Sequence, residues 1–330
     1  MKYIKLGKSN LEVSVIAMGC RPIVGDATCG PQKLSDAIDT INTALSIGVN
    51  FFDTAESYGD GYSEEILGKA LLGKRDKAII ATKVSPNHLK PKDIIESCEK
   101  SLKRLRTNYI DLYYIHFANW EVPIEDTFIA LEKLKKDGKI RAIGCCNFGK
   151  IDLMDLLNKN GWVEINQLCY SLLFRAIEYE VLPLCIEKNI GIACYAPLAQ
   201  GLLTGMFESI ADVPEGRKIT RFYSSNRPRS RHNEAGVEEE LFNVIAKIKK
   251  ICDENNINMI HLAISWLLSI PGVKVVITGT REPNEIIFNA KAVDVVLSNE
   301  IIKNLKDITE PLKQKLGKNI DLFESKPRSR

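Results

Sequence analysis

The sequence has 330 residues, 45% of them hydrophobic, so the chain can bury a large core as one α/β domain or as two smaller domains. Its 45 lysine and arginine residues nearly balance 42 acidic residues, and the net charge of +3 gives no reason to expect a nucleic-acid or membrane partner. No stretch approaches the roughly 20 consecutive apolar residues of a membrane span, and the first residues lack the apolar core of a signal peptide, which predicts a cytoplasmic protein.

Short apolar runs recur along the chain and predict eight β-strands. Amphipathic segments separate them, for example at 91–105, where Ile94, Cys98 and Leu102 recur at helical spacing, and at 124–136. The predicted strands, in chain order, are 13–19, 49–53, 78–83, 109–116, 140–145, 163–168, 190–196 and 273–279.

Eight strand–helix units with continuously apolar strands predict a closed parallel barrel, the (β/α)8 TIM barrel of the α/β class. An open doubly wound sheet is the alternative. No G-x-G-x-x-G motif follows an early strand, which counts against a dinucleotide-binding domain of the Rossmann type.

The chain shows no domain boundary, so residues 1–330 are predicted to form a single domain. An extended loop follows the seventh strand and lasts until a helix that starts near Glu238. Its stretch 217–232 holds six lysine or arginine residues and no acid, and it either covers a phosphate group or is a solvated basic loop. Residues 311–330 are polar and form either a C-terminal tail or a strip that closes a substrate mouth.

Polar residues stand at the ends of several predicted strands. They are Asp53, Lys83, His116, Asn147 and Gln167, each from a different strand or the loop directly after it. Barrel enzymes place their chemistry at the C-terminal ends of the strands, so these side chains are expected to line one mouth.

Tyr58 follows Asp53 by five residues and completes a set with a defined chemistry. The Lys83 cation is expected to lower the pKa of the Tyr58 phenol and so make it a proton donor, while Asp53 keeps the ammonium charged and in place. His116 would orient a substrate oxygen beside the phenol. Taken singly, the same residues are equally well explained as a loop tyrosine, a buried ion pair and a core histidine.

The sequence resembles the aldo-keto reductase family from about residue 6 to about residue 305. The motifs that carry the resemblance are FFDTAESYG, IIATK, IDLYYIH, KIRAIGCCNF, INQLCYSLL, ACYAPLAQGLLTG and VVITGTREPNEIIFNA. The resemblance is strongest to bacterial sugar, glyceraldehyde-phosphate and general stress reductases, and it implies a (β/α)8 barrel that binds an extended nicotinamide dinucleotide, usually NADPH.

The resemblance also assigns residues. The catalytic tetrad of the family falls on Asp53, Tyr58, Lys83 and His116. Asn147 and Gln167 would hold the carboxamide of the nicotinamide, and Tyr195 would stack on its ring. The remaining cofactor residues are implied to be Leu198, Gln200 and Gly201 along the pyrophosphate, and Gly279, Thr280, Arg281 and Asn289 around the adenosine end.

Several positions depart from the family pattern. Cys146 and Ala196 stand where serine is common, and both changes remove hydrogen bonds to the cofactor. Glu282 and Glu285 lie near Arg281, and their carboxylates would oppose a 2′-phosphate, so NADH is a possible cofactor beside NADPH.

Two functions of different class follow from the resemblance. The first is an oxidoreductase that reduces a small aldehyde or ketone to the alcohol with NAD(P)H, with Tyr58 as proton donor. The alternative is a regulatory or redox-sensing NADP(H)-binding subunit with slow turnover, similar to potassium-channel β subunits, in which Cys145 and Cys146 could sense redox state. Most of the nine cysteines are expected to be buried thiols, and no metal site is predicted.

Overall fold

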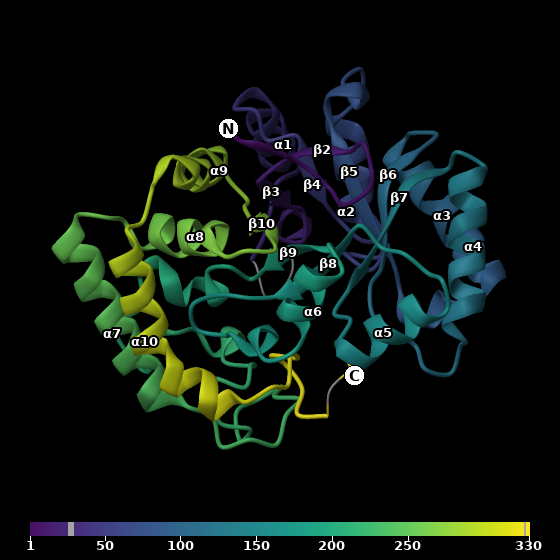
Figure 1. Cartoon of the computed structure of the whole chain (residues 1–330). Coiled ribbons are helices and arrows are strands. Elements are labelled where there is room, and N and C mark those ends of the chain that lie inside the picture. Colours follow the sequence, from purple (N-terminus) through teal and green to yellow (C-terminus); the bar gives the residue numbers. More distant parts are fainter. Residues whose placement is uncertain (26–29, 327) are drawn as a thin grey trace.

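A closed barrel of parallel strands forms the centre of the computed structural model, which describes residues 1–25, 30–326 and 328–330 (Figure 1). Strand β10 pairs with β9 on one side and with β3 on the other, and these two pairings close the sheet. The barrel strands of the described chain are β3 (Ile16–Gly19), β4 (Phe51–Asp53), β5 (Ile79–Val84), β6 (Ile110–Ile115), β7 (Ile140–Cys146), β8 (Ile165–Cys169), β9 (Gly191–Tyr195) and β10 (Val273–Gly279).

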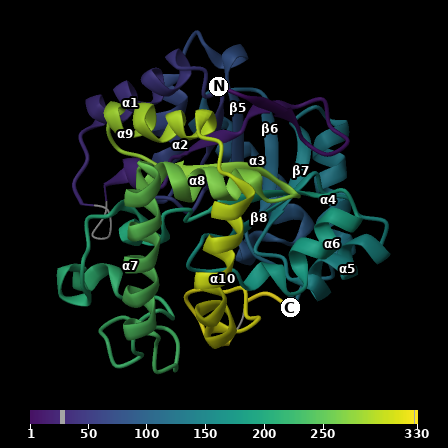
Figure 2. The ribbon, with the colours of Figure 1, turned by 60° about the vertical axis from the view of Figure 1, so that its left-hand side comes forward.

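Helices surround the barrel on its outside, as Figures 1 and 2 show. They are α1 (Leu34–Ser46), α2 (Tyr62–Ala70), α3 (Pro91–Leu105), α4 (Ile124–Lys136), α5 (Lys150–Asn158), α6 (Val181–Glu187), α7 (Glu238–Asn255), α8 (Met259–Ser269), α9 (Pro283–Ala290) and α10 (Asn299–Leu316). Helices α7 and α10 are additions to the eightfold repeat and lie against each other. The architecture confirms the predicted (β/α)8 barrel.

Helix α3 illustrates why the sequence-based prediction succeeds. Pro91 occupies the first turn, where a missing N–H costs nothing, and Ile94, Cys98 and Leu102 form the face that is buried against the barrel. The helix ends at Arg106, whose φ of 53° is left-handed. The helix therefore begins and ends where its sequence pattern predicts.

The first predicted strand, 13–19, is divided in the structure. Its first residues belong to β2 (Glu12–Ser14), which pairs antiparallel with β1 (Tyr3–Lys5), and only Ile16–Gly19 enters the barrel as β3. At the division, the Ser14 N–H donates to the side chain of Asn50 at 2.7 Å, and the Val15 N–H still donates to the Lys2 carbonyl at 3.0 Å. Leu6 and Leu11, in the turn of this hairpin, pack into the barrel interior and belong to the same buried cluster as Phe51 of β4.

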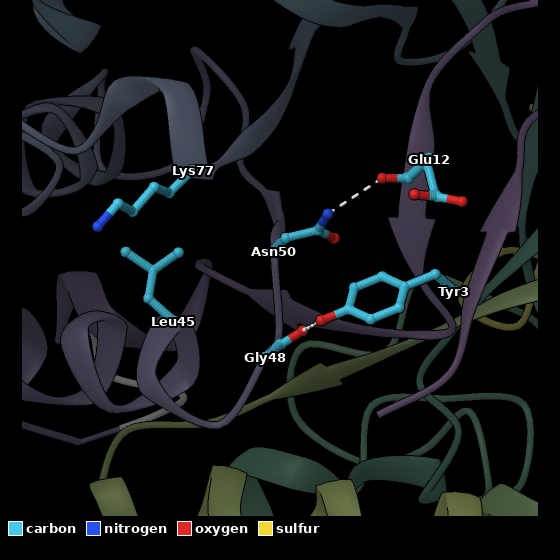
Figure 3. Close-up of a pocket in the computed structure, with 6 residues that line it drawn as sticks. All are labelled: Tyr3, Glu12, Leu45, Gly48, Asn50 and Lys77. Atoms are coloured by element: carbon cyan, nitrogen blue, oxygen red, sulfur yellow. Dashed lines mark hydrogen bonds between the residues drawn. The ribbon is translucent and has the colours of Figure 1, made fainter.

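A cavity of about 340 Å³ lies at this N-terminal end of the barrel (Figure 3). Two of its polar side chains are hydrogen-bonded to the backbone of other lining residues. The Tyr3 hydroxyl donates to the Gly48 carbonyl at 2.8 Å, and the Asn50 amide donates to the Glu12 carbonyl at 3.0 Å. The cavity lies at the end opposite to the strand termini that carry the candidate chemistry.

The loop after β9 and the segment after α10 extend beyond the eightfold repeat. The long loop contains three short 3-10 segments between Ala199 and Arg217 before α7 begins at Glu238. Helix α10 continues past residue 311, where the polar tail was predicted to start, because Leu312 and Leu316 are buried. None of the helices in the described residues is long and apolar enough to cross a membrane.

Candidate active site

Four side chains predicted to act together do meet at the C-terminal end of the barrel. Asp53 is the last residue of β4, Lys83 lies in β5, and His116 directly follows β6. Tyr58 lies in the short connection between β4 and α2. Because β4, β5 and β6 are neighbours in the sheet, the barrel places residues separated by up to 63 positions in the sequence (116 − 53) beside one another.

Lys83 is the centre of the cluster. Its ammonium nitrogen lies 2.6 Å from Asp53 Oδ1, 2.7 Å from the Thr54 carbonyl oxygen and 3.3 Å from the Tyr58 hydroxyl, so each of its three N–H groups has an acceptor. The side chain is fully buried. Burial alone would lower the pKa of Lys83, but the Asp53 carboxylate and the Tyr58 phenol raise it, and the net direction is upward. Lys83 is therefore a permanent cation.

The pKa of the Tyr58 phenol differs from the sequence-based expectation. Burial raises the pKa of Tyr58 above its usual value, and the Lys83 cation opposes that rise without reversing it. The predicted net lowering is wrong because the sequence shows the cation but not the loss of solvent around the phenol. The phenol is consequently protonated at neutral pH, which is the form that a proton donor needs.

His116 is neutral at neutral pH. Burial, together with the charges of Lys83 and Arg328, lowers the pKa of His116 to about 3. Its ring lies edge-on to the Tyr58 ring at 5.9 Å between centroids and stacks on Phe117 at 5.4 Å. A neutral imidazole beside a phenol can donate one hydrogen bond to an oxygen without changing charge.

Two amide side chains lie at the same end of the barrel, and one of them contacts the ion pair. The Gln167 amide nitrogen donates to Asp53 Oδ2 at 2.7 Å, so that both carboxylate oxygens of Asp53 are hydrogen-bonded. The Asn147 amide nitrogen lies 3.2 Å from the His116 carbonyl oxygen, and its oxygen accepts from the Tyr195 hydroxyl at 2.9 Å. Asn147 has a left-handed φ of 60°, a conformation that asparagine tolerates better than most residues.

Strained backbone follows β9, at the residues predicted to hold the pyrophosphate. Ala199, Gln200 and Gly201 all have left-handed φ values, of 46°, 58° and 100°. Non-glycine residues in this region cost on the order of 1 kcal/mol or more each, and such strain clusters at ligand sites. Leu198 precedes the strained residues and is half-buried.

One cation of the basic stretch 217–232 lies beside the left-handed residues that follow β9. Arg217 Nη1 lies 3.4 Å from the Gln200 carbonyl oxygen, beside Gly201. Other cations of the stretch pair with carboxylates: Lys218 with Glu215, Arg221 with Glu234, and Arg227 with Glu238. Arg217 cannot be singled out from the sequence, because nothing in the composition of the stretch distinguishes it from its neighbours.

The residues predicted to surround the adenosine end follow β10. Gly279 ends that strand, and the Thr280 hydroxyl is fully buried without a hydrogen-bond partner in the described part of the chain. A buried hydroxyl of this kind is the group that a bound polar ligand would satisfy. Asn289 lies buried in α9. The residues present therefore fit a nicotinamide dinucleotide.

Two carboxylates occupy the start of α9 beside Arg281. Glu285 accepts hydrogen bonds from the backbone N–H groups of Arg281 at 2.7 Å and Glu282 at 3.4 Å, and the Glu282 side chain caps the same helix in return. The reciprocal arrangement is a capping box. It holds two carboxylates beside Arg281, the residue predicted to lie at the adenosine end of the cofactor.

The segment after α10 reaches the mouth of the site. The Arg328 guanidinium lies 4.3 Å above the Phe117 ring and pairs with Asp321 at 2.7 Å. The carbonyl oxygen of Arg330 accepts from the backbone N–H of Ile151 at 2.8 Å, at the start of α5. From the sequence, this segment was predicted to be either a tail or a strip that closes the mouth. The segment has no local sequence pattern that predicts the position of Arg328.

Cys145 and Cys146 are adjacent in β7 and therefore point to opposite sides of the sheet. Burial raises the pKa of each thiol. A buried thiol with a raised pKa holds little thiolate, which is the reactive form. The geometry therefore gives no support to the suggested redox sensing by these two residues.

Comparison with known proteins identifies the family. The profile of the aldo/keto reductase family matches residues 17–310. Among curated proteins, the aldo-keto reductase YhdN of Bacillus subtilis (strain 168) is 33% identical over 325 residues, which cover 94% of each chain. The NADH-specific methylglyoxal reductase of Escherichia coli (strain K12) is 30% identical over 341 residues, covering 95% of this chain and all of that protein.

Among solved structures, an aldo-keto reductase from Klebsiella pneumoniae in complex with NADPH is similar, with a TM-score of 0.74 and 27% sequence identity. The match covers 93% of this chain and 95% of that one. Because the family profile spans most of the sequence and the relatives match along nearly their full length, the chain belongs to the aldo/keto reductase family.

Proposed function

We propose that the protein reduces an aldehyde or ketone to the alcohol with a nicotinamide cofactor, and that Tyr58 donates the proton. The observation that supports this most directly is the contact between the Tyr58 hydroxyl and the buried Lys83 ammonium at 3.3 Å. Membership of the aldo/keto reductase family supports an aldo-keto reduction as the reaction class.

The chain's own residues supply the acid and the electrostatic environment. A bound reduced nicotinamide would supply the hydride to the carbonyl carbon. Tyr58 transfers its phenolic proton to the carbonyl oxygen, and the resulting phenolate is stabilised by Lys83, which Asp53 keeps in place. His116 donates a hydrogen bond to the same oxygen from its neutral ring. The phenolate regains its proton from solvent before the next turnover.

The cofactor is proposed to be NADPH, with NADH as a weaker second choice. One relative is crystallised with NADPH, whereas another is named NADH-specific, so the family context alone leaves both open. Arg281 is the cation at the start of α9 that would attract a 2′-phosphate, and Glu282 and Glu285 reduce that attraction.

The reductase is distinguished from a slowly turning regulatory subunit by counting turnovers. A panel of small aldehydes, including sugars, triose phosphates and methylglyoxal, is mixed with excess NADPH and followed by the loss of its absorbance. A reductase consumes many equivalents of NADPH per protein, whereas a sensor consumes about one, and the second result would reject the proposal.

The first prediction concerns the proton donor. Tyr58→Phe removes only the phenolic hydroxyl, so kcat should fall by roughly 10²-fold or more, the usual size of a lost acid–base contribution. NADPH binding, measured by fluorescence titration, should be retained. The control is Tyr62→Phe, four residues away and 39% exposed, which should behave as wild type. Near-normal turnover in the Tyr58 variant would exclude Tyr58 as the acid.

The second prediction concerns the coupling of Lys83 to Tyr58. Lys83→Met should reduce kcat about as strongly as Tyr58→Phe, and the double variant should lose little more, since groups that act as one unit are not additive. If Lys83→Met does not fold, a variant with both Lys83→Met and Asp53→Asn replaces it, because this variant leaves no buried carboxylate unpaired. Fully additive losses would show that the two groups act independently.

The third prediction uses the low pKa of His116. The unfolded chain binds a proton at this histidine near pH 6.5, but the folded protein binds it only near pH 3, so acidification through this range favours the unfolded state. His116→Gln should therefore make the free energy of unfolding less pH-dependent, by up to about 1.4 kcal/mol per pH unit. Urea denaturation between pH 5 and 7 measures how the free energy of unfolding changes with pH in wild type and in His116→Gln. The same pH dependence in both proteins would contradict the prediction.

The fourth prediction concerns cofactor preference. Wild type should prefer NADPH over NADH by about ten- to a hundredfold, or about 1.4 to 2.8 kcal/mol, because the carboxylates near Arg281 weaken its field. Arg281→Ala should raise the KM for NADPH and leave that for NADH nearly unchanged, at one fixed ionic strength. Lys291→Ala, an exposed cation just past α9, is the control. Equal increases in the KM for NADPH and the KM for NADH would show that Arg281 stabilises the loop and does not bind the 2′-phosphate.

A further inference from the structure

Residues 85–89, between β5 and α3, contact the loops on both sides of them, and we call these five residues the hub segment. The Ser85 N–H donates to Glu56 Oε1 at 2.7 Å, in the loop that carries Tyr58. The Pro86 carbonyl accepts from the Asn119 side chain at 2.8 Å, in the loop that begins at His116. Lys83, in β5, precedes the hub segment by two residues. The loop that carries Tyr58 and the loop that begins at His116 therefore both contact the segment that directly follows the strand of Lys83.

Glu56 connects the loop of Tyr58 to the hub segment. It lies three residues after Asp53 and two before Tyr58, and only 9% of its side chain is exposed. Besides the Ser85 N–H, the same carboxylate oxygen accepts from His88 Nδ1 at 2.9 Å. Since a carboxylate can only accept, His88 must carry its proton on Nδ1 in this contact.

His88 is anchored in turn. The Nδ1–H that donates to Glu56 also lies 3.3 Å, nitrogen to oxygen, from the hydroxyl of Ser97, which can share this donor as a second acceptor and is buried in α3. The chain of contacts therefore runs from the loop of Tyr58, through Glu56 and His88, to a helix that is packed against the barrel. The Glu56 carboxylate is held in its ionised form, because the contacts with Ser85 and His88 outweigh burial and lower its pKa.

The loop of Tyr58 is attached to β5 mainly at its first residue. The Thr54 N–H donates to the Ala81 carbonyl at 2.8 Å, and Lys83 Nζ donates to the Thr54 carbonyl at 2.7 Å. Closer to Tyr58, the Glu56 N–H lies 3.4 Å from the Lys83 carbonyl oxygen, and Ser57, Gly59 and Asp60 are exposed. The Tyr58 hydroxyl is 3.3 Å from Lys83 Nζ, which is already long for a strong hydrogen bond. A small displacement of the loop would separate the phenol from the cation that stabilises its anion.

We propose that Glu56 is a positioning residue, which holds the loop of Tyr58 against the hub segment and so fixes the distance between the phenol and Lys83. The inference rests on the proposed function, because it concerns the acid of that reaction. Glu56 acts through geometry: its carboxylate oxygen is needed as an acceptor for Ser85 and His88, and its negative charge is not needed by the reacting groups.

Three variants separate position from charge and from general stability. Glu56→Ala removes the acceptor, Glu56→Gln keeps an acceptor oxygen at the same place without the charge, and Glu65→Ala removes an exposed acid in the first turn of α2 as the matched control. For each protein, kcat and KM are measured with NADPH and the best aldehyde of the panel. Hydrogen exchange of the backbone amides of Tyr58, Ser63, Ser85 and His88 is measured on the same proteins without substrate.

The expected result is a split between the two kinetic constants. Glu56→Ala should lower kcat by ~10-fold, because a misplacement of about 1 Å at a reacting group is costly, while both KM values stay within about threefold of wild type. Glu56→Gln should restore kcat to within about threefold of wild type, since the acceptor is retained. The four amides should exchange faster in Glu56→Ala than in wild type, and at the wild-type rate in Glu56→Gln and Glu65→Ala.

Failure of this inference is distinguishable from failure of the proposed function. If wild type shows no multiple turnover, the proposed function is rejected, and the hydrogen exchange alone decides whether Glu56 holds the loop. If wild type turns over and Glu56→Ala has the same kcat, or the same exchange rates at all four amides, the positioning role is overturned. A Glu56→Gln variant as slow as Glu56→Ala would also overturn it, since charge and not geometry would then be required.

Discussion

The buried ion pair between Asp53 and Lys83 is the interaction on which the site depends. Removing two charges from water costs several kcal/mol per ion unless geometry and additional hydrogen bonds offset the loss. Here Lys83 gives each of its N–H groups to an acceptor, and Asp53 uses one oxygen for Lys83 and the other for Gln167. The barrel supplies those partners from β4, β5 and β8, so the pair is satisfied only when the sheet is closed.

The same pair determines the protonation states around it. Burial, together with the charges of Lys83 and Arg328, lowers the pKa of His116 to about 3, so the histidine is neutral. Burial raises the pKa of the Tyr58 phenol more than Lys83 lowers it, so the phenol is protonated at neutral pH. One fixed cation therefore lies among neutral groups, an arrangement suited to stabilising a negative charge that appears only during the reaction.

Loops far apart in the sequence complete the site. Glu56 and the hub segment join the loops after β4 and β5, and the strained residues after β9 lie beside Arg217 from the long loop. Arg328 lies over the Phe117 ring, which stacks on His116. A change in any of these connecting segments is expected to act on Tyr58 and Lys83 through their position, because none of these segments forms a hydrogen bond with the Tyr58 hydroxyl in the described structure.

The sequence by itself determined the barrel and showed which polar side chains stand at the ends of its strands. Apolar runs alternating with amphipathic segments specify local structure, and polar residues at strand ends stand out because a parallel barrel brings all those ends to one mouth. Only the tertiary structure decided the rest. The direction of the Tyr58 pKa, the capping of α9 by Glu285 and the positions of Glu56 and Arg328 depend on burial and on contacts between distant segments. Such contacts leave no periodic trace in the sequence, because they are set by how the loops fold back on the closed barrel.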